Sequence, residues 1–292
     1  MDYFLRPKPA YFAIARELRP YTVGLSRKDV KTSTKPDSAA FFEIDTSVEV
    51  WGTNSTTYKQ NVFCIFFLFV SCTADCVEAF QLQATLVIEA FDLHDKSFQW
   101  KTEKSVTLGP NRSSELWSGR VPGQEIRTKL SDVPRAIILS ARLIDVYGDG
   151  RDVLARCANW YVLLSSEWGL LKSRQTYYMS LRPEPFKFVK FPSIQDVNLK
   201  ITTSPVEDTD LETALERIRP FSRSSPDVEN VTKITLSASL PIKGIVLDAE
   251  GSEDVKWSDQ ALDLVPGDEQ VVFAWGLKGR VPTARYLGDG SA

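Results

Sequence analysis

The chain has 292 residues, 43% of them hydrophobic and 25% charged, which is the profile of a folded protein with about two domains of ordinary size. Its formal net charge is -3 and its pI is near 5.5. This balance argues against nucleic acid or a membrane surface as the main partner, because both favour a basic face. Four cysteines in a chain of this length do not make a disulfide framework.

A short amphipathic helix is predicted near the start of the chain. Residues 10–18 (AYFAIAREL) are mostly good helix formers, and Tyr11, Ile14 and Leu18 fall on one face at helical spacing. Pro20 ends the helix. An isolated helix would expose this apolar face to water, so we expect another part of a protein to cover it.

Alternation of apolar and polar residues then predicts a first set of short strands. They lie at residues 21–26, 41–51, 83–91, 99–108, 115–119, 136–145 and 153–160, with a polar loop at 28–38. About seven strands are enough for one antiparallel sandwich.

Two stretches interrupt this pattern, at residues 58–81 and 161–182. The first contains an apolar run at 62–70, about half the length of a transmembrane helix. It also contains Cys64, Cys72 and Cys76, which raise the question of a zinc site. The only histidine, His94, is distant and fits a solvated turn, so neither a metal nor a cofactor is predicted.

A second sandwich is predicted after a proline-rich hinge that begins at residue 183. Its strands are expected at residues 196–203, 234–239, 242–247, 255–257, 261–264 and 271–274, with turns at Pro-Gly and Ser-Asp pairs. Residues 204–229 are interpreted as a loose insertion with a short helix at 211–218. The predicted fold class is therefore all-β, with two β-sandwich domains in tandem.

Aromatic residues suggest a possible surface for stacking on sugar rings. The candidates are Trp51, Trp100, Trp117, Trp160, Trp257 and Trp275. Because sandwiches routinely bury tryptophan, a place in the core or a domain interface is favoured for each of them. Trp257 adjoins a polar turn, so it is the best candidate for an exposed sugar or domain contact.

Acidic residues near two predicted turns raise the questions of a calcium loop and of a catalytic acid pair. Around the predicted hairpin turn at residues 148–150 lie Asp145, Asp149 and Asp152, which lack the glycine and terminal glutamate of an EF-hand calcium loop. Near the chain's end lie Asp254, Asp259 and Asp263, which are interpreted as turn caps rather than as a catalytic acid pair.

Three blocks of sequence carry a resemblance to a known family. They are residues 6–18 (RPKPAYFAIAREL) with 22–24, residues 257–260 (WSDQ) with 263–268 (DLVPGD) and 276–279 (GLKG), and residues 285–290 (RYLGDG). The chain resembles the C-terminal part, after the catalytic barrel, of fungal β-mannosidases of glycoside hydrolase family 2. The resemblance implies a link leaving the barrel at 1–20 and two immunoglobulin-like sandwiches at 21–182 and 183–292.

The resemblance also has implications for activity. Family members hydrolyse terminal non-reducing β-D-mannose residues, and retaining glycosidases need two carboxylates about 5 Å apart. The family's acid/base glutamate follows an asparagine, and this sequence contains no Asn-Glu pair. No catalytic residue can be carried over, so we expect a non-catalytic fragment that supports the barrel. Its expected partners are the absent barrel and mannose-containing glycans. The alternative is a free-standing carbohydrate-binding or adhesion module.

The two interruptions occur where the family continues directly from strand to strand. We hypothesise that residues 58–81 and 161–182 are translated introns in a gene model that also starts late; a spliced transcript carrying both in frame would refute this. Residues 1–3 show no secretory signal, which favours an intracellular location without fixing it.

Overall fold

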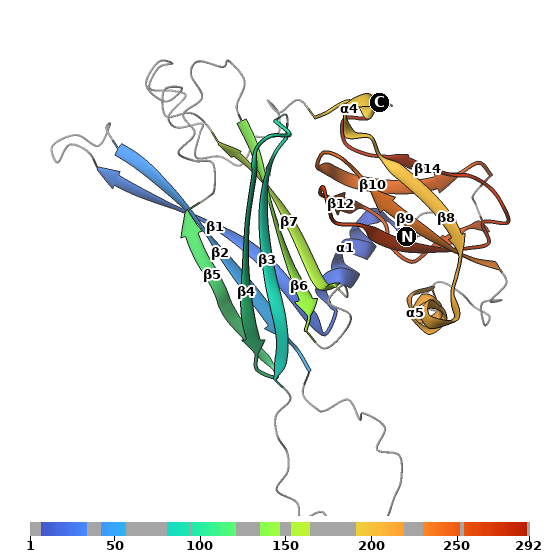
Figure 1. The fold of residues 1–292 in the computed structure, drawn as a ribbon, viewed down its shortest axis with the longest axis horizontal. Helices are drawn as coiled ribbons and strands as arrows, with labels where there is room; N and C mark the ends of the chain where they lie inside the picture. Colours follow the sequence, from blue (N-terminus) through green and yellow to red (C-terminus); the bar gives the residue numbers. More distant parts are fainter. Residues whose placement is uncertain are drawn as a thin grey trace, which may run out of the picture.

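The computed structural model describes residues 7–33, 42–56, 81–93, 95–120, 135–146, 153–163, 191–218, 230–251 and 254–290. Cys64, Cys72, Cys76, His94 and the 148–150 turn lie outside these residues, as do nearly all of the first interruption and most of the second. The described chain forms two β-sandwiches, and helix α1 (Pro9–Glu17) lies between them (Figure 1). No helix in these ranges is both long and apolar enough to cross a membrane.

The first sandwich is built from two antiparallel sheets. One has the order β1 (Tyr21–Ser33), β2 (Phe42–Asn54), β5 (Arg112–Arg120). The other has the order β4 (Gln99–Leu108), β3 (Leu82–Asp92), β6 (Arg135–Asp145), β7 (Val153–Leu163). Their inner faces enclose an apolar core that includes Val23, Val50, Leu86, Leu108, Leu116 and Leu143.

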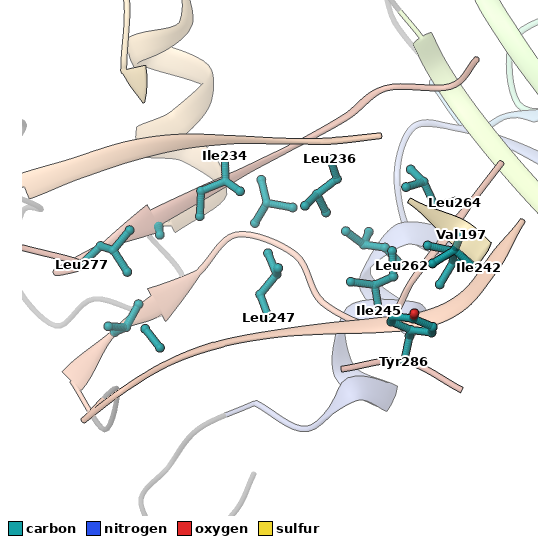
Figure 2. Packing of buried hydrophobic residues seen from close by; sticks show 14 of the residues in the cluster. Val197, Ile234, Leu236, Ile242, Ile245, Leu247, Leu262, Leu264, Leu277 and Tyr286 are labelled. Carbon is teal, nitrogen blue, oxygen red and sulfur yellow. The ribbon is translucent and has the colours of Figure 1, made fainter. Parts of the chain in front are cut away.

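The second sandwich also has two antiparallel sheets. The order of one is β12 (Leu262–Leu264), β10 (Ile242–Ala249), β14 (Pro282–Arg285). The order of the other is β11 (Lys256–Trp257), β13 (Gln270–Trp275), β9 (Val231–Ser237), β8 (Lys200–Pro205). Figure 2 shows Ile234 and Leu236 on one sheet facing Ile245 and Leu247 on the other. The alternation seen in the sequence produces this core.

The strands are longer than predicted at two places. The sequence predicts a loop at 28–38, but β1 runs to Ser33 and pairs with β2 from Tyr21↔Asn54 to Ser33↔Phe42. β7 likewise continues past Trp160 to Leu163, into the second interruption. Backbone hydrogen bonds hold the polar end of the β1–β2 hairpin as a strand without an apolar pattern, so alternation alone misses it.

Two helices accompany the second sandwich. The short α4 (Ile194–Val197), which sequence periodicity misses, starts with a capping box formed by Ser193 and Asp196. Helix α5 (Asp208–Ile218) contains the helix predicted at 211–218. Its Ala214 is buried in a small cluster with Val231 and Phe273, so this part of the expected loose insertion packs on the sandwich.

Candidate functional site at the junction of the sandwiches

A region of polar contacts lies where α1 is placed between the two sandwiches (Figure 1). We call this region the junction. It consists of the last turn of α1 with Arg19, the facing residues of β3, β6 and β7, and residues 258–268 of the second sandwich.

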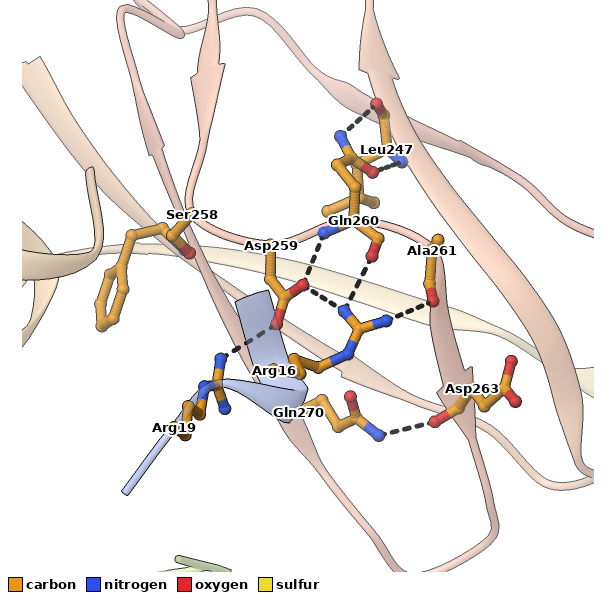
Figure 3. A network of polar contacts seen from close by, with 10 residues as sticks. Arg16, Arg19, Leu247, Ser258, Asp259, Gln260, Ala261, Asp263 and Gln270 are labelled. Carbon is orange, nitrogen blue, oxygen red and sulfur yellow. Dashed lines mark hydrogen bonds and ion pairs between the residues drawn. The ribbon is translucent and has the colours of Figure 1, made fainter. Parts of the chain in front are cut away.

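Arg16 attaches α1 to the second sandwich. Its guanidinium pairs with the Asp259 carboxylate and donates hydrogen bonds to the carbonyl oxygens of Gln260 at 2.9 Å and Ala261 at 3.0 Å (Figure 3). Arg19 lies 3.4 Å from the other carboxylate oxygen of Asp259. The planar, five-donor guanidinium suits this arrangement, because one side chain satisfies a carboxylate and two carbonyls together.

The turn that receives Arg16 is held by its own hydrogen bonds. The Gln260 side chain bonds the backbone of Leu247 twice, accepting from its N–H at 2.6 Å and donating to its carbonyl at 2.9 Å. The Ser258 hydroxyl oxygen accepts from the Phe273 N–H at 2.8 Å. Ala261 has a φ of +56°, which is unusual for a residue with a side chain. The receptor for Arg16 is therefore fixed in position by the second sandwich.

A second ionic contact joins the two sandwiches directly. Asp268, only 4% exposed, lies 3.4 Å from Arg142 of β6. Arg156 of β7 donates a hydrogen bond from Nη2 to the same carboxylate at 3.4 Å, and its Nε lies 3.2 Å from the other carboxylate oxygen. Arg142 also pairs with Glu89 of β3. A buried carboxylate is tolerated here because it has cationic partners on the opposing surface.

An apolar contact lies alongside these ion pairs. Phe91, Leu93 and Ile138 of the first sandwich form one buried cluster with Val265 of the second, and the half-buried Phe191 packs against it. Burying apolar surface supplies attraction, whereas the ion pairs mainly fix the relative orientation. The junction is thus a packed interface with charged side chains beside an apolar patch.

Two groups near the junction, Arg19 and Cys157, have pKa values that are shifted by burial and by charges on neighbouring elements. Burial lowers the pKa of Arg19, Asp259 opposes this, and the charges of Arg16 and Arg156 lower it further. Burial likewise raises the pKa of the Cys157 thiol on β7; a backbone hydrogen bond at Leu25 opposes this, and the charges of Glu17 of α1 and Asp263 of the second sandwich raise it slightly further. Both groups sense charges from the helix and from the two sandwiches.

The opposite side of α1 is open. Phe12 is 4% exposed, whereas Tyr11, Ile14 and Leu18 are 40%, 60% and 79% exposed. The face that the sequence predicts to need a cover is therefore the one that neither sandwich covers.

The tryptophans are placed as follows. Trp100 and Trp117 have ring centroids 6.1 Å apart and pack on the first core. Trp257 is half-buried against the second core rather than freely exposed, and Trp275 is half-buried beside Phe273. Among the tryptophans whose side chains the structure describes, Trp51 is the exposed one, at 39%. The side chain of Trp160 lies outside the described set.

The acidic residues of the C-terminal turns have separate roles. Asp254 accepts from Arg280 at 2.8 Å, and Asp263 pairs with Lys243 at 2.9 Å. Asp259 is the receptor for α1, a role that the sequence reading missed. The sequence did contain one signal of this role. Asp259 lies in the WSDQ block and Arg16 in the RPKPAYFAIAREL block, and both blocks carry the resemblance to the same family. Among the described residues, no three of His, Cys, Asp or Glu are grouped so that they could hold a metal ion.

The fold and the junction define a tandem β-sandwich unit with a linking helix between its two bodies. A β-D-mannosidase from Dictyoglomus thermophilum contains the same fold: the match covers 98% of this chain and 24% of that one, with 12% identity and a TM-score of 0.53.

No family model matches the chain. By sequence it is 24% identical over 291 residues to β-mannosidase B of Thermothelomyces thermophilus and 28% identical over 294 residues to that of Aspergillus flavus. Each match covers 99% of this chain and 25% of the relative, so the chain spans about a quarter of their length. The chain is similar to a partial, C-terminal-type region of the fungal β-mannosidases, as the sequence resemblance predicted.

Proposed function

We propose that this chain is a non-catalytic supporting region of a larger β-mannosidase-like protein that hydrolyses terminal non-reducing β-D-mannose residues. In this role it presents α1 to the catalytic barrel and holds the helix in a fixed orientation. The chain alone does not turn over a β-mannoside.

The observation that carries the proposal is the two-sided environment of α1. One side is fixed to the second sandwich through Arg16, and Phe12 of the same helix is buried. The other side presents Ile14 and Leu18 to solvent, although a helix with this apolar face gains stability only when the face is covered. The relatives are about four times longer, and we infer that part of this additional length covers the face.

The junction supports the same role. Arg16 and Asp268 are far apart in the sequence, yet both lie in the junction. Arg16 joins α1 to the second sandwich, and Asp268 joins the second sandwich to the first. A rigid unit transmits the position of one element to the others, which a flexible tether does not. This is the property expected of a support.

A chimeric enzyme tests the proposal. In β-mannosidase B of Aspergillus flavus, the matched quarter is deleted in one variant and replaced by this chain in a second. A third carries the replacement with Ile14→Ser and Leu18→Ser, and a fourth carries Val281→Ser, an exposed position on the second sandwich. We expect an inactive or unstable deletion, recovery in the chimera, loss with the helix variant and retention with Val281→Ser. A deletion variant with full activity and unchanged thermal midpoint would contradict the proposal.

The second candidate, a free-standing carbohydrate-binding or adhesion module, has a different expectation. It requires aromatic side chains that are available at the surface. Trp257, the residue favoured from the sequence, is half-buried, and we retain it only as a candidate domain contact. Trp51 is the one observation that favours sugar binding, and it does not conflict with a supporting role.

A further inference from the structure

The outer face of the β1–β2–β5 sheet carries an aromatic side chain that the core does not use. Along β2, Val50 is fully buried, Trp51 is 39% exposed, and Gly52 points inward, where an added Cβ would lie 2.6 Å from the Leu116 side chain. Strand alternation therefore places Trp51 outward. In Figure 1 this sheet lies on the side of the first sandwich away from the second sandwich.

The neighbours of Trp51 leave its ring accessible. Its partner across β1 is Gly24, and a Cβ built there meets no atom within 4 Å. Across β5 its partner is Glu115, displaced by a bulge that turns both Leu116 and Trp117 toward the core. An indole with an open space on one side and a polar neighbour on the other is available for stacking.

The ring is also held at its edge. Trp51 Nε1 donates to Glu49 Oε2 at 3.3 Å, two residues along the same face, and Lys28 lies 3.6 Å from the other oxygen of Glu49. One row further, the hydroxyls of Thr53 and Ser113 are 2.9 Å apart. Hydroxyl and carboxylate groups therefore surround the indole on its own face of the sheet.

We propose that this face binds a neutral pyranose sugar, with Trp51 as the stacking platform. The apolar C–H face of a pyranose ring covers an indole well, and the sugar hydroxyls can bond to Glu49, Glu115, Thr53 and Ser113. Glu49 is paired with Lys28, and Glu115 adds a further carboxylate, so the charge on this face disfavours an anionic ligand. The inference goes beyond the supporting role, which needs neither Trp51 nor this sheet face.

The test is calorimetric titration of the purified chain with β-1,4-mannohexaose and, separately, cellohexaose, at up to about 5 mM because single-platform sites are weak. Trp51→Ala is expected to weaken binding by about tenfold or more, as truncation of an aromatic anchor does. The matched control is Tyr11→Ala, which removes an aromatic of equal exposure, 40% against 39%, on α1 and is expected to leave sugar binding unchanged.

A variant that adds volume beside Trp51 separates loss of the site from loss of the fold. Gly24→Val fits a strand and meets no atom at its Cβ, so the thermal midpoint should hold or rise while the space beside Trp51 is filled and binding weakens. Binding to one hexaose alone would identify the sugar, and binding to both would indicate a general pyranose platform.

The inference is overturned if neither hexaose binds, or if Trp51→Ala binds as the wild type does. Neither result would affect the chimera experiment, because that experiment depends on Ile14 and Leu18. Failure of the supporting role and failure of the sugar site are therefore distinguishable.

Discussion

At the scale of single residues, Asp259 joins α1 to the second sandwich. Its carboxylate, 13% exposed, accepts Arg16 and is approached by Arg19, and it also accepts from the backbone N–H of Gln260 at 2.9 Å. The sequence identifies it only as a turn cap, which it also is. Its pairing with an arginine some 240 residues away is a property of the folded chain.

Asp259→Ala should destabilise the chain by about 1–3 kcal/mol, because two arginines and a backbone donor lose their acceptor in a partly buried site. The matched control is Asp254→Ala, whose carboxylate also pairs with an arginine but is 57% exposed, and for which we expect a loss below about 1 kcal/mol. Urea unfolding of the two variants measures the difference. Equal losses would mean that the contact between Arg16 and Asp259 does not fix the helix.

Asp268→Ala is expected to cost about 3 kcal/mol, since Arg156 would lose the carboxylate that it pairs with in a largely buried contact and Arg142 would keep only Glu89. Because this contact joins the two sandwiches, the variant should also scatter X-rays as a more extended particle. A variant with the stability and radius of gyration of the wild type would show that the apolar cluster alone holds the sandwiches together.

Cys157, which packs against the core of the first sandwich, should make the free energy of unfolding depend on pH at alkaline pH. Burial raises the pKa of its thiol, so the folded chain retains the proton more tightly than the unfolded chain does. Its contribution to stability is therefore complete below the ordinary thiol pKa, about 8.5, and is lost as the pH rises through the higher folded value.

The measurement is urea unfolding of the wild type and Cys157→Ala from neutral pH to about pH 10.5. The stability advantage of the wild type should shrink across this range. A difference that stays constant or grows would contradict the burial of the thiol.

At the scale of elements, periodicity is a good guide where one face is buried. It predicts α1, most strands of both sandwiches and the helix within α5. It fails where the hydrogen-bond ladder or a cap decides the structure. The polar end of β1 is held by its pairing with β2, and α4 depends on the capping box of Ser193 and Asp196.

Two glycines of the β1–β2 pair should respond oppositely to the same substitution. Gly52→Ala would put a Cβ 2.6 Å from the Leu116 side chain and cost about 1–3 kcal/mol through overpacking. Gly24→Ala meets no atom within 4 Å and should be neutral or slightly stabilising, since it restricts the unfolded chain. Thermal unfolding of the two variants tests this, and a stable Gly52→Ala would contradict the inward direction of residue 52.

At the scale of the whole molecule, the tandem all-β architecture follows from the sequence, but the junction does not. Alternation and turn residues specify each sandwich locally. Which charges meet between the sandwiches depends on their relative placement, and no periodic pattern encodes that. Arg16, Asp259 and Asp268 lie in blocks that resemble the fungal β-mannosidases, which we now interpret as segments that build the interface.

The proposed supporting role and the proposed sugar platform use different surfaces of the chain. The helix face at Ile14 and Leu18 is apolar and suits a protein surface, whereas the sheet face around Trp51 is surrounded by hydroxyls and carboxylates. The two proposals therefore do not compete for the same surface.

The most direct test of the account is hydrolysis of p-nitrophenyl β-D-mannopyranoside by the purified 292-residue chain, beside intact β-mannosidase B of Aspergillus flavus. The account predicts no release of nitrophenol above the buffer blank from this chain and steady release from the intact relative. Saturable turnover by the chain itself would contradict the account and would require a catalytic acid pair among carboxylates that we place in turns and interface contacts.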